Sequence, residues 1–301
     1  RNIPKNCVEI EDEVHQMCPI AYWHVWDNRP TPRFNDVLYE STDLINCHSH
    51  LTYEMVKENF PEKTNFIPHS LPEEIFFPPG KHAKNAYRRQ LLGPERQDHF
   101  VAFWMNRNAK RKRPNDVLLA WKLFMDMLKK EGKNDATLVM HTDPRDPEGP
   151  NLELTSDMLD IRKSVFFSNQ RVDFEKVNVL HNMCDVVFNI AYAEGFGLGT
   201  LEAMQTGTPI IAVKTGGLTR QVVDHRDGSE NGISLPVEVQ TLVGSQSVPY
   251  IYEDYVSPET TAKALYEMYS MDPEEREALG QKARDYVLSE FAYQDTVDKW
   301  H

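Results

Sequence analysis

Short apolar runs alternate with longer amphipathic segments along most of the chain. Short apolar runs are typical of buried strands, and the amphipathic segments have the spacing of helices that cover a sheet. We expect strands at residues 20–25, 43–47, 66–68, 100–105, 136–141, 165–167, 185–191 and 209–213. We expect helices at residues 53–59, 115–130, 177–183, 200–205, 257–271 and 273–289. The alternation predicts an α/β fold with parallel sheets.

A proline-rich and polar stretch, residues 68–94, divides this alternation into two series. Such composition is typical of a connection between domains. We therefore expect a first Rossmann-like domain at residues 1–80, a linker at 81–96, a second Rossmann-like domain at 97–290 and a terminal segment at 291–301. A Rossmann-like domain needs several parallel strands, and only three short candidates precede the connection. We expect the first domain to be incomplete, so that a missing segment or a partner covers its edge.

Composition and charge narrow the range of functions. The 301 residues are enough for two domains, and no apolar run approaches the ~20 residues that span a bilayer. With 33 basic and 46 acidic residues the net charge is −13, which disfavours nucleic acid as a partner. The four cysteines lack the spacing of a disulfide framework, which favours reduced thiols and a cytoplasmic location.

Two glutamates eight positions apart, Glu194 and Glu202, flank a glycine-rich turn. The turn is expected between a strand and a helix, where glycines let the backbone approach a ligand and free helix amides favour phosphate. Glu194, at the end of the strand, could accept hydrogen bonds from sugar hydroxyls. Glu202, expected in the first helical turn, could accept both hydroxyls of a ribose, or could simply stabilise the helix dipole.

This segment resembles the Glu-(seven residues)-Glu signature of retaining glycosyltransferases of family 4 and their GT-B relatives. Three further segments resemble the same family: residues 66–78 its entry into the linker, 105–113 its phosphate-binding loop, and 208–217 its Gly-Gly loop. The similarity covers nearly the whole chain from about Ile20. It implies a GT-B architecture, in which two Rossmann-like domains face each other across a cleft and the terminal segment crosses back to the first domain.

The resemblance also implies an activity. A sugar would pass from a nucleoside diphosphate donor, with retention of anomeric configuration, to an acceptor that is a glycan, a lipid or a protein. The nucleotide sugar would be a co-substrate, and no further cofactor is expected. Because the chain has no Asp-x-Asp pair of the kind that metal-dependent transferases use, we expect catalysis without a metal ion.

The basic loop at residues 105–113 can be interpreted without the family. Arg107 and Lys112 follow a predicted strand, at the carboxyl edge where α/β sheets bind ligands. Two fixed cations there would neutralise a leaving diphosphate, as a metal ion does in other transferases. A solvated basic loop and a nuclear-localisation run at residues 110–113 are the alternatives, and Arg111 competes with Lys112 for the phosphate.

Residues 22–27 end a strand that should face the cleft. The family often places a histidine or aspartate here, near the anomeric carbon; His24 is the better match and Asp27 the second. His24 could instead be a core or rim residue. The run from Cys47 to His50 suggests zinc, but no other cluster completes four ligands. It matches the family's strand-to-helix turn, in which Ser49 would cap the helix.

Two features depart from the family. Arg220 stands three positions after the Gly-Gly pair, where an acidic residue is usual. Residues 236–257 form a longer stretch than usual, which is either an edge excursion packed by tyrosines or a lid or acceptor-side loop.

The candidate site therefore has two groups of residues. Those assigned to catalysis are Glu194, Arg107, Lys112 and His24. Those assigned to donor binding are Gly195, Phe196, Gly197, Leu198, Thr200, Glu202, Arg111 and Gln170. Two other functions fit the same pattern: a GT-B sugar-nucleotide epimerase or glucan synthase, and a donor-binding GT-B module without transfer activity.

Overall fold

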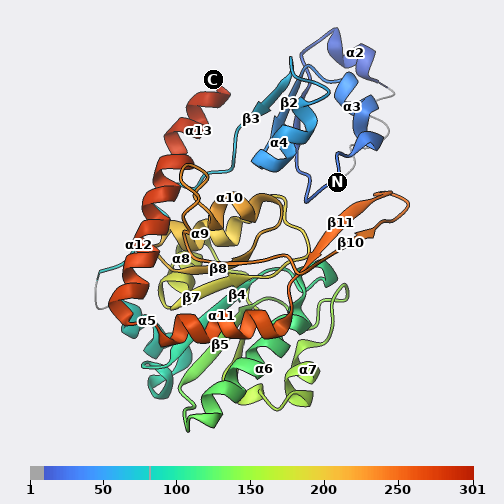
Figure 1. Ribbon diagram of the computed structural model, residues 1–301. Coiled ribbons are helices and arrows are strands. Elements are labelled where there is room, and N and C mark those ends of the chain that lie inside the picture. The colour runs from blue at the N-terminus through green and yellow to red at the C-terminus, as the bar shows by residue number, and fades with distance from the viewer. Residues whose placement is uncertain (1–9, 81–82) are drawn as a thin grey trace.

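The structure is a computed structural model that describes residues 10–80 and 83–301. These residues form two α/β regions, with the smaller above the larger in Figure 1. We call residues 10–80 the first region and residues 83–301 the second region. Parallel strands make up one sheet in each region, in the orders β1-β2-β3 and β6-β5-β4-β7-β8-β9. The expected α/β class with parallel sheets is confirmed.

The first region is a three-stranded sheet with short helices. Its strands are β1 (Ala21–His24), β2 (Leu44–Cys47) and β3 (Thr64–Phe66). Its helices are α2 (Glu11–His15), η1 (Arg33–Asn35), α3 (Asp36–Glu40) and α4 (His50–Lys57). As expected, Ser49 caps α4, since its Oγ accepts a hydrogen bond from the backbone N of Thr52 at 3.2 Å. The third strand was predicted at 66–68 but ends at Phe66; the next residues are Ile67 and Pro68, and proline has no amide to donate to a ladder.

The predicted linker contains a helix that packs against the second region. The helix α5 (Ala83–Leu92) is followed by η2 (Pro94–Arg96). Arg88 Nη2 and Lys84 Nζ donate to the buried carboxylate of Asp185, at 2.6 and 2.7 Å. Burial opposes ionisation of Asp185, but the two cations more than offset it and hold the pKa of this carboxyl below its usual range. Structurally, α5 therefore belongs to the second region.

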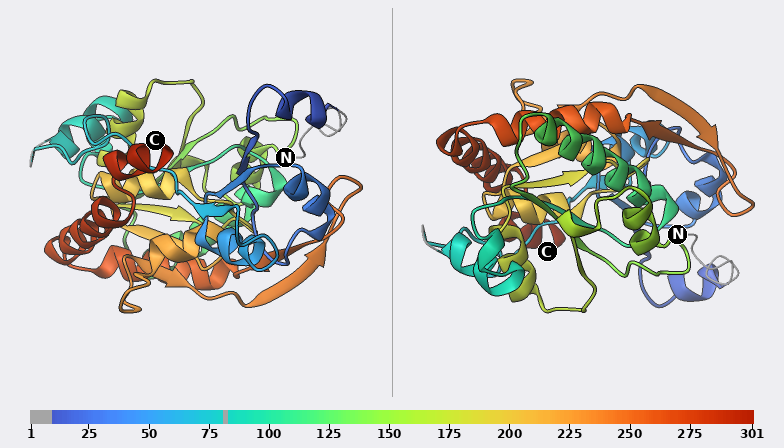
Figure 2. Two further views of the ribbon diagram at one scale, coloured as in Figure 1. Left: turned by 90° about the horizontal axis from the view of Figure 1, so that it is seen from above. Right: turned by 90° about the horizontal axis from the view of Figure 1, so that it is seen from below.

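The second region is a six-stranded parallel sheet with helices on both faces (Figure 2). Its strands are β4 (Phe100–Met105), β5 (Ala136–His141), β6 (Val165–Ser168), β7 (Val186–Asn189), β8 (Ile210–Val213) and β9 (Ile233–Leu235). The first helices are η3 (Lys110–Lys112), α6 (Pro114–Lys130), α7 (Leu152–Met158), η4 (Arg162–Ser164), α8 (Phe174–Asn182) and α9 (Leu198–Gln205). The others are η5 (Gly216–Leu218), α10 (Thr219–Val222), α11 (Pro258–Ser270), α12 (Pro273–Glu290) and α13 (Tyr293–Trp300). The central strands are almost wholly buried, as a sheet covered on both faces requires.

The last two helices join the two regions. Gly280 lets α12 pack closely on the end of α9, because a Cβ there would lie 2.0 Å from the carbonyl oxygen of Gly207. The chain then continues into α13, which lies beside the first region in Figure 1. The indole ring of Trp300 meets the ring of Trp23 edge-on, with centroids 5.9 Å apart. The terminal helix therefore contacts the first region.

Residues 236–257 contain an antiparallel hairpin. Its strands are β10 (Val239–Val243) and β11 (Ile251–Tyr255), with Thr241 opposite Glu253. In Figure 1 the hairpin projects from the second region and passes beneath the first. The backbone N of Tyr252 donates to the carbonyl of Arg29 at 2.8 Å, so the hairpin bonds directly to the first region.

Candidate functional site

A cavity of about 280 Å³ lies between the two regions, at the carboxyl ends of β4 and β7. Strand order runs outward from β4 through β5 to β6, and outward in the other direction from β7 through β8 to β9. The cavity is therefore at the point where the strand order reverses, which is where open α/β sheets bind ligands. The polar and charged side chains that line it are Asp27, His69, Asn106, Arg111, Lys112, Asn189, Glu194 and Thr200.

The glycine-rich turn, residues 195–199, lines this cavity. The chain leaves β7, turns through Gly195 and Gly197, and begins α9 at Leu198. A Cβ at Gly195 would lie 2.5 Å from the Val25 side chain and 2.9 Å from Asp27 Oδ1, so only glycine fits where the regions meet. The free amides at the N-terminus of α9 favour an anion at this end of the cavity.

A buried ion pair of the second region lines the cavity. Lys112 Nζ donates to Glu194 Oε2, and Asn189 Nδ2 approaches the same oxygen at 3.4 Å. Burial lowers the pKa of Lys112, although the neighbouring Glu194 carboxylate opposes this shift. Removing either partner would leave an uncompensated buried charge. The pair therefore offers a cation for a phosphate and a carboxylate for hydroxyl groups.

A second pair of opposite charges lies beside the first. Arg111 Nη1 is 3.7 Å from Asp27 Oδ2 and donates to the carbonyl oxygen of Ala193 at 3.3 Å. Burial raises the pKa of Asp27, and the guanidinium of Arg111 opposes that rise. The first region thus contributes a carboxyl group, and the second contributes two cations and another carboxylate.

Arg107 lies apart from Lys112, although the sequence assigned both to the diphosphate. Its Nε donates to Asp146 Oδ2 at 2.8 Å, and its Nη1 is 2.9 Å from Glu148 Oε2. More than half of its side chain is exposed, and it is not among the residues that line the cavity. Arg111, which the sequence treated as a competitor of Lys112, lines the cavity together with it.

Glu202 is also outside the cavity lining. It is buried, and His181 Nε2 donates to its Oε2 at 3.0 Å. The expectation that Glu202 lies in the first turn of the helix is wrong. Because the left-handed backbone of Gly197 starts α9 at Leu198, the first turn contains no acidic residue and Glu202 begins the second.

His24 lies in the interior of the first region. Its side chain is 1% exposed, its Nε2 shares a 2.7 Å hydrogen bond with the Tyr39 hydroxyl, and burial lowers its pKa to about 3. It does not line the cavity, whereas Asp27, the second choice of the sequence, does. Gln170 is exposed in the loop after β6, and it too is absent from the lining.

The side chains of Cys47 and His48 lie in different surroundings and do not converge on one site. Cys47 is in the core of the first region, while His48 stacks on His69 with ring centroids 4.1 Å apart. Trp23 Nε1 donates to His48 Nδ1 at 2.6 Å. Within residues 10–80 and 83–301, no group of three or more His, Cys, Asp or Glu side chains is arranged to hold a metal ion.

A model of the family "Glycosyl transferases group 1" matches residues 88–244, which is more than half of the chain. The chain belongs to this family. Among curated relatives, D-inositol 3-phosphate glycosyltransferase of Stackebrandtia nassauensis is 33% identical over 171 residues, covering 56% of this chain and 37% of that protein. The protein of the same name from Corynebacterium jeikeium is 25% identical over 270 residues, covering 88% of this chain and 57% of that protein. The chain thus spans between about a third and somewhat over half of these relatives' lengths.

Solved structures of glycosyltransferases have the same fold. Anabaena HepE in complex with UDP aligns with a TM-score of 0.75 at 17% identity, covering 99% of this chain and 76% of HepE. This likeness confirms the GT-B fold that the sequence of this group 1 glycosyltransferase chain predicts.

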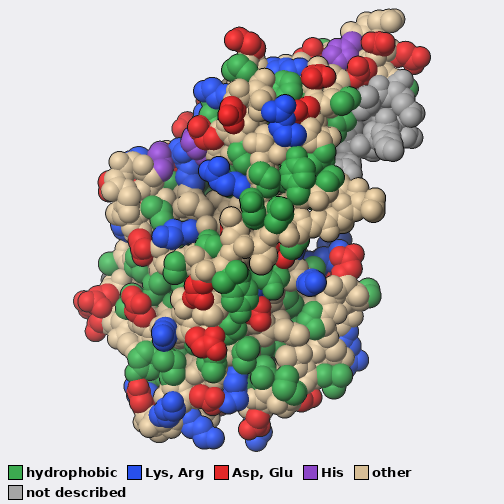
Figure 3. Space-filling view, turned by 45° about the vertical axis from the view of Figure 1, so that its right-hand side comes forward, with side chains coloured by type: hydrophobic (Ala, Val, Ile, Leu, Met, Phe, Trp, Pro, Cys, Tyr) green, Lys and Arg blue, Asp and Glu red, His purple; other side chains and the backbone are tan. Residues whose placement is uncertain are grey.

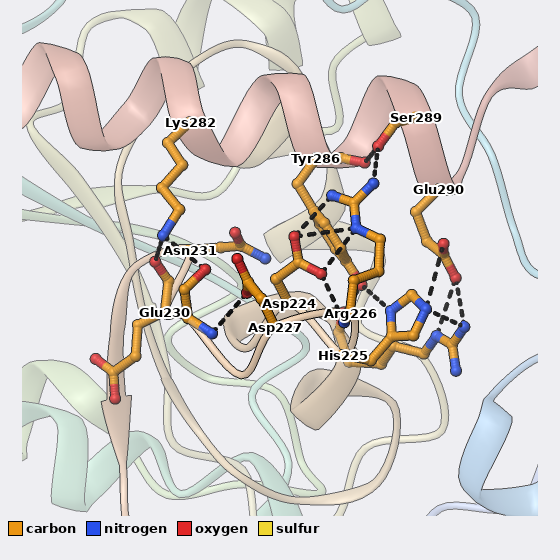
Figure 4. A network of polar contacts seen from close by, with 12 residues as sticks. Asp224, His225, Arg226, Asp227, Glu230, Asn231, Lys282, Tyr286, Ser289 and Glu290 are labelled. Atoms are coloured by element: carbon orange, nitrogen blue, oxygen red, sulfur yellow. Dashed lines mark hydrogen bonds and ion pairs between the residues drawn. The ribbon is translucent and has the colours of Figure 1, made fainter.

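Arg220, which departs from the family pattern, is part of a network that anchors α10 to α12. Its Nη2 donates to Glu290 Oε1 at 2.7 Å, and its carbonyl oxygen accepts from the Tyr286 hydroxyl at 2.7 Å. Figure 4 shows the neighbouring loop held to the same helix, where Arg226 donates to Ser289 Oγ at 3.0 Å. The basic residue therefore pairs with an acidic residue on α12 and has a structural role in this family member.

Several lining residues were not identified from the sequence of this family member. Asn106, Asn189 and His69 have no periodic or glycine-rich context that distinguishes them from ordinary polar residues. The position of Asn189 near the carboxyl end of the strand predicted at 185–191, five residues before Glu194, is the signal that could have found it.

The surface of the molecule carries charges of both signs. On the face drawn in Figure 3, acidic and basic side chains are interspersed. The two cations of the cavity are therefore a local feature, as a chain with net charge −13 requires for an anion site. Among the helices that the structure describes, none is long and apolar enough to cross a bilayer.

Proposed function

We propose that this chain carries the donor site of a retaining glycosyltransferase, which moves a sugar from a nucleoside diphosphate sugar to an acceptor hydroxyl. The observation that carries the proposal is the cavity at the β4–β7 edge, where Lys112, Arg111 and the N-terminus of α9 meet Glu194. Cations and helix amides suit a diphosphate, and a carboxylate suits sugar hydroxyls. The scattered cysteines, with Cys47 and Cys184 buried as free thiols, support a cytoplasmic location.

Each residue has a proposed role in the reaction. Lys112 and Arg111 neutralise the diphosphate as it leaves, and Glu194 orients the sugar. Gly195, Phe196, Gly197 and Leu198 supply backbone amides, and Thr200 completes the donor site. Gln170 is exposed outside the lining and keeps no proposed role. Asp27 lines the cavity from the first region and is the group proposed to contact the sugar. A ribose contact at Glu202, which bonds to His181 outside the lining, is the part of the proposal that the Glu202→Ala variant tests. Neither Arg107 nor His24 keeps a proposed catalytic role, because Arg107 is paired on the surface and His24 is in a core.

The proposed chemistry needs no residue as a nucleophile. The bond from the anomeric carbon to the diphosphate oxygen breaks while the acceptor oxygen bonds to the same face of that carbon. The proton of the acceptor hydroxyl passes to an oxygen of the leaving diphosphate. Lys112 and Arg111 stabilise the negative charge that develops on that diphosphate, which is the task a metal ion performs in other transferases.

The nature of the donor is supported by the neighbouring structures. HepE has been solved with UDP and with UDP-glucose, so nucleotides with a diphosphate suit this fold. The curated relatives are named for D-inositol 3-phosphate, which makes that compound a rational first acceptor to test.

A thermal-shift panel of uridine, guanosine and adenosine diphosphate sugars tests the proposal. A donor at about 100 times its dissociation constant adds about 2.7 kcal/mol to the free energy of unfolding, so a true donor raises the melting temperature clearly. A panel in which no nucleotide sugar stabilises the chain would refute the donor site. Incubating the selected donor alone, and then with D-inositol 3-phosphate or glycan acceptors, separates transfer from epimerisation and from binding without transfer.

A further inference from the structure

The hairpin β10–β11 contacts the loop that carries Asp27. The backbone N of Tyr252 donates to the carbonyl of Arg29 at 2.8 Å, and the backbone N of Arg33 donates to the Tyr250 hydroxyl at 3.1 Å. The Tyr250 ring also meets the Phe34 ring edge-on at 5.3 Å. Residues 236–257 therefore form a contact between the regions, in which Tyr250 packs against the first region.

Asp254, on β11, is the most connected side chain of this contact. It is 3% exposed, and its Oδ2 accepts from Asn28 Nδ2 at 2.6 Å and from Thr215 Oγ1 at 2.7 Å. Its Oδ1 accepts from Gln240 Nε2 at 2.7 Å, and its backbone N donates to the carbonyl of Tyr192 at 2.7 Å. A buried carboxylate with three side-chain donors holds those donors in fixed positions.

The partners of Asp254 lie next to the cavity on both sides. Asn28 directly follows Asp27 in the first region, and Thr215 directly precedes the Gly-Gly loop in the second. The backbone N of Tyr192 donates to the carbonyl of Arg111 at 2.9 Å, so this contact also reaches the cationic loop. Asp254 thus connects three loops that surround the cavity, two through its carboxylate and the third through its backbone N.

We propose that Asp254 is a positioning residue that holds Asp27 in the donor cavity by tying Asn28 to the second region. Asp254 does not line the cavity itself. The catalytic consequence rests on the proposed function, in which the second region binds the nucleotide and Asp27 contacts the sugar. Loss of Asp254 therefore lowers turnover more than it lowers nucleotide affinity.

Hydrogen–deuterium exchange of the full chain tests the tie without any ligand. In Asp254→Ala, we expect backbone amides at residues 26–34 to exchange about tenfold faster or more, because the buried donors Asn28 and Thr215 lose their acceptor. In Asp254→Asn the side-chain carbonyl oxygen can still accept hydrogen bonds from Asn28 and Thr215. The Gln240 side-chain amide can rotate so that its oxygen accepts from the new NH2 group. Exchange at residues 26–34 should therefore stay close to that of the unmodified chain. Thr241→Ala, at an exposed position on β10, is the matched control and leaves exchange unchanged.

Turnover of the donor selected by the thermal-shift panel is the second readout. Asp254→Ala should release nucleoside diphosphate about tenfold more slowly, with donor affinity within about threefold of the unmodified chain, and Asp254→Asn should restore most of the rate. A general loss of structure would instead lower donor affinity and turnover together. In that case Asp254→Asn and Asp254→Ala would show the same losses.

Each outcome decides between the proposals. If Asp254→Ala leaves exchange at residues 26–34 unchanged, Asp254 does not hold this loop to the second region and the proposal is wrong. If exchange rises but turnover does not fall, the positioning role is wrong and the proposed function stands. If the chain binds no nucleotide sugar, the proposed function and the catalytic consequence are both refuted. The exchange experiment still tests whether Asp254 holds the loop at residues 26–34. Should Asp254→Ala fail to fold, Asn28→Ala removes only the first region's side of the contact and carries the same expectations.

Discussion

The two regions that enclose the cavity differ in how they are stabilised. The second region has one continuous buried core around its six-stranded sheet. The buried cluster of the first region consists of Tyr39, Ile45, Cys47 and Val56, with a few partly buried neighbours. Lys112 and Glu194 therefore rest on a large core, whereas the loop of Asp27 is held by contacts with the other region. Under the proposed function, nucleotide binding would then depend on the second region alone, and sugar transfer would depend on how the two regions meet.

The largest effect on turnover is expected from replacing Lys112, which belongs to the region with the larger core. Lys112→Ala removes a buried charge from the cavity, so turnover should fall on the order of 10²–10³, as when one preorganised charge-stabilising group is lost. Arg107→Ala is the matched control from the same loop. Because Arg107 forms only exposed ion pairs, its replacement should change the rate by no more than about threefold. Equal losses in the two variants would contradict the placement of the diphosphate at Lys112.

A chelator tests whether Lys112 and Arg111, or a metal ion, neutralise the leaving diphosphate. If protein cations neutralise the leaving group, EDTA should leave the turnover of the unmodified chain intact. Loss of turnover in EDTA that manganese or magnesium restores would show that a metal ion performs this task.

A smaller effect is expected at the second glutamate of the signature. Glu202→Ala should lower nucleotide affinity by about 1.5–3 kcal/mol, the range for charged hydrogen bonds, if its carboxylate bridges the ribose hydroxyls. It also leaves the buried His181 without its partner, so the free energy of unfolding should fall by about 1–3 kcal/mol. His181→Ala removes the same internal pair and keeps the carboxylate. Calorimetry should show normal nucleotide affinity in His181→Ala; a loss equal to that of Glu202→Ala would assign Glu202 a structural role alone.

The last prediction concerns the acid stability of the first region. The pKa of His24 falls from 6.5 in an unfolded chain to about 3 in the fold, because of burial. Between these values the unfolded state binds a proton that the folded state does not, so stability falls as pH falls, by about 1.4 kcal/mol per unit. His24→Gln removes this titration and keeps a partner for Tyr39. Denaturant unfolding at about pH 7 and about pH 5 should show a shallower pH dependence in the variant; identical dependence would mean that His24 is not buried as described.

Local patterns in the sequence predicted the larger region well. The apolar runs of β4, β5, β7 and β8 are long enough to indicate buried parallel strands, and the glycine-rich turn indicates an anion site wherever it meets a helix. Lys112, Arg111 and Glu194 follow from the rule that sites lie at the carboxyl ends of strands. These inferences use residues close together in sequence, whose positions are fixed by the strand that precedes them.

Other features depend on contacts distant in sequence and could not be predicted. Arg107 is turned outward by Asp146, which is 39 positions away and forms no recognisable pattern with it. Strand β1 has the alternation that faces His24 into its own region, but nothing in the sequence says that the loop after it continues to the cavity. The partners of Asp254 include Asn28, which is 226 positions away, so the hairpin could be recognised only as a long insertion.

The edge-on contact between Trp23 and Trp300 has an optical consequence. The two indoles belong to different regions, are 56% and 43% exposed, and meet at an interplanar angle of 76°. Indole transitions at this separation couple, and their combined near-ultraviolet circular dichroism depends on the distance and angle between the rings. Near-ultraviolet circular dichroism of the unlabelled chain should therefore report a change in how the two regions are arranged, such as one on addition of a candidate nucleotide sugar.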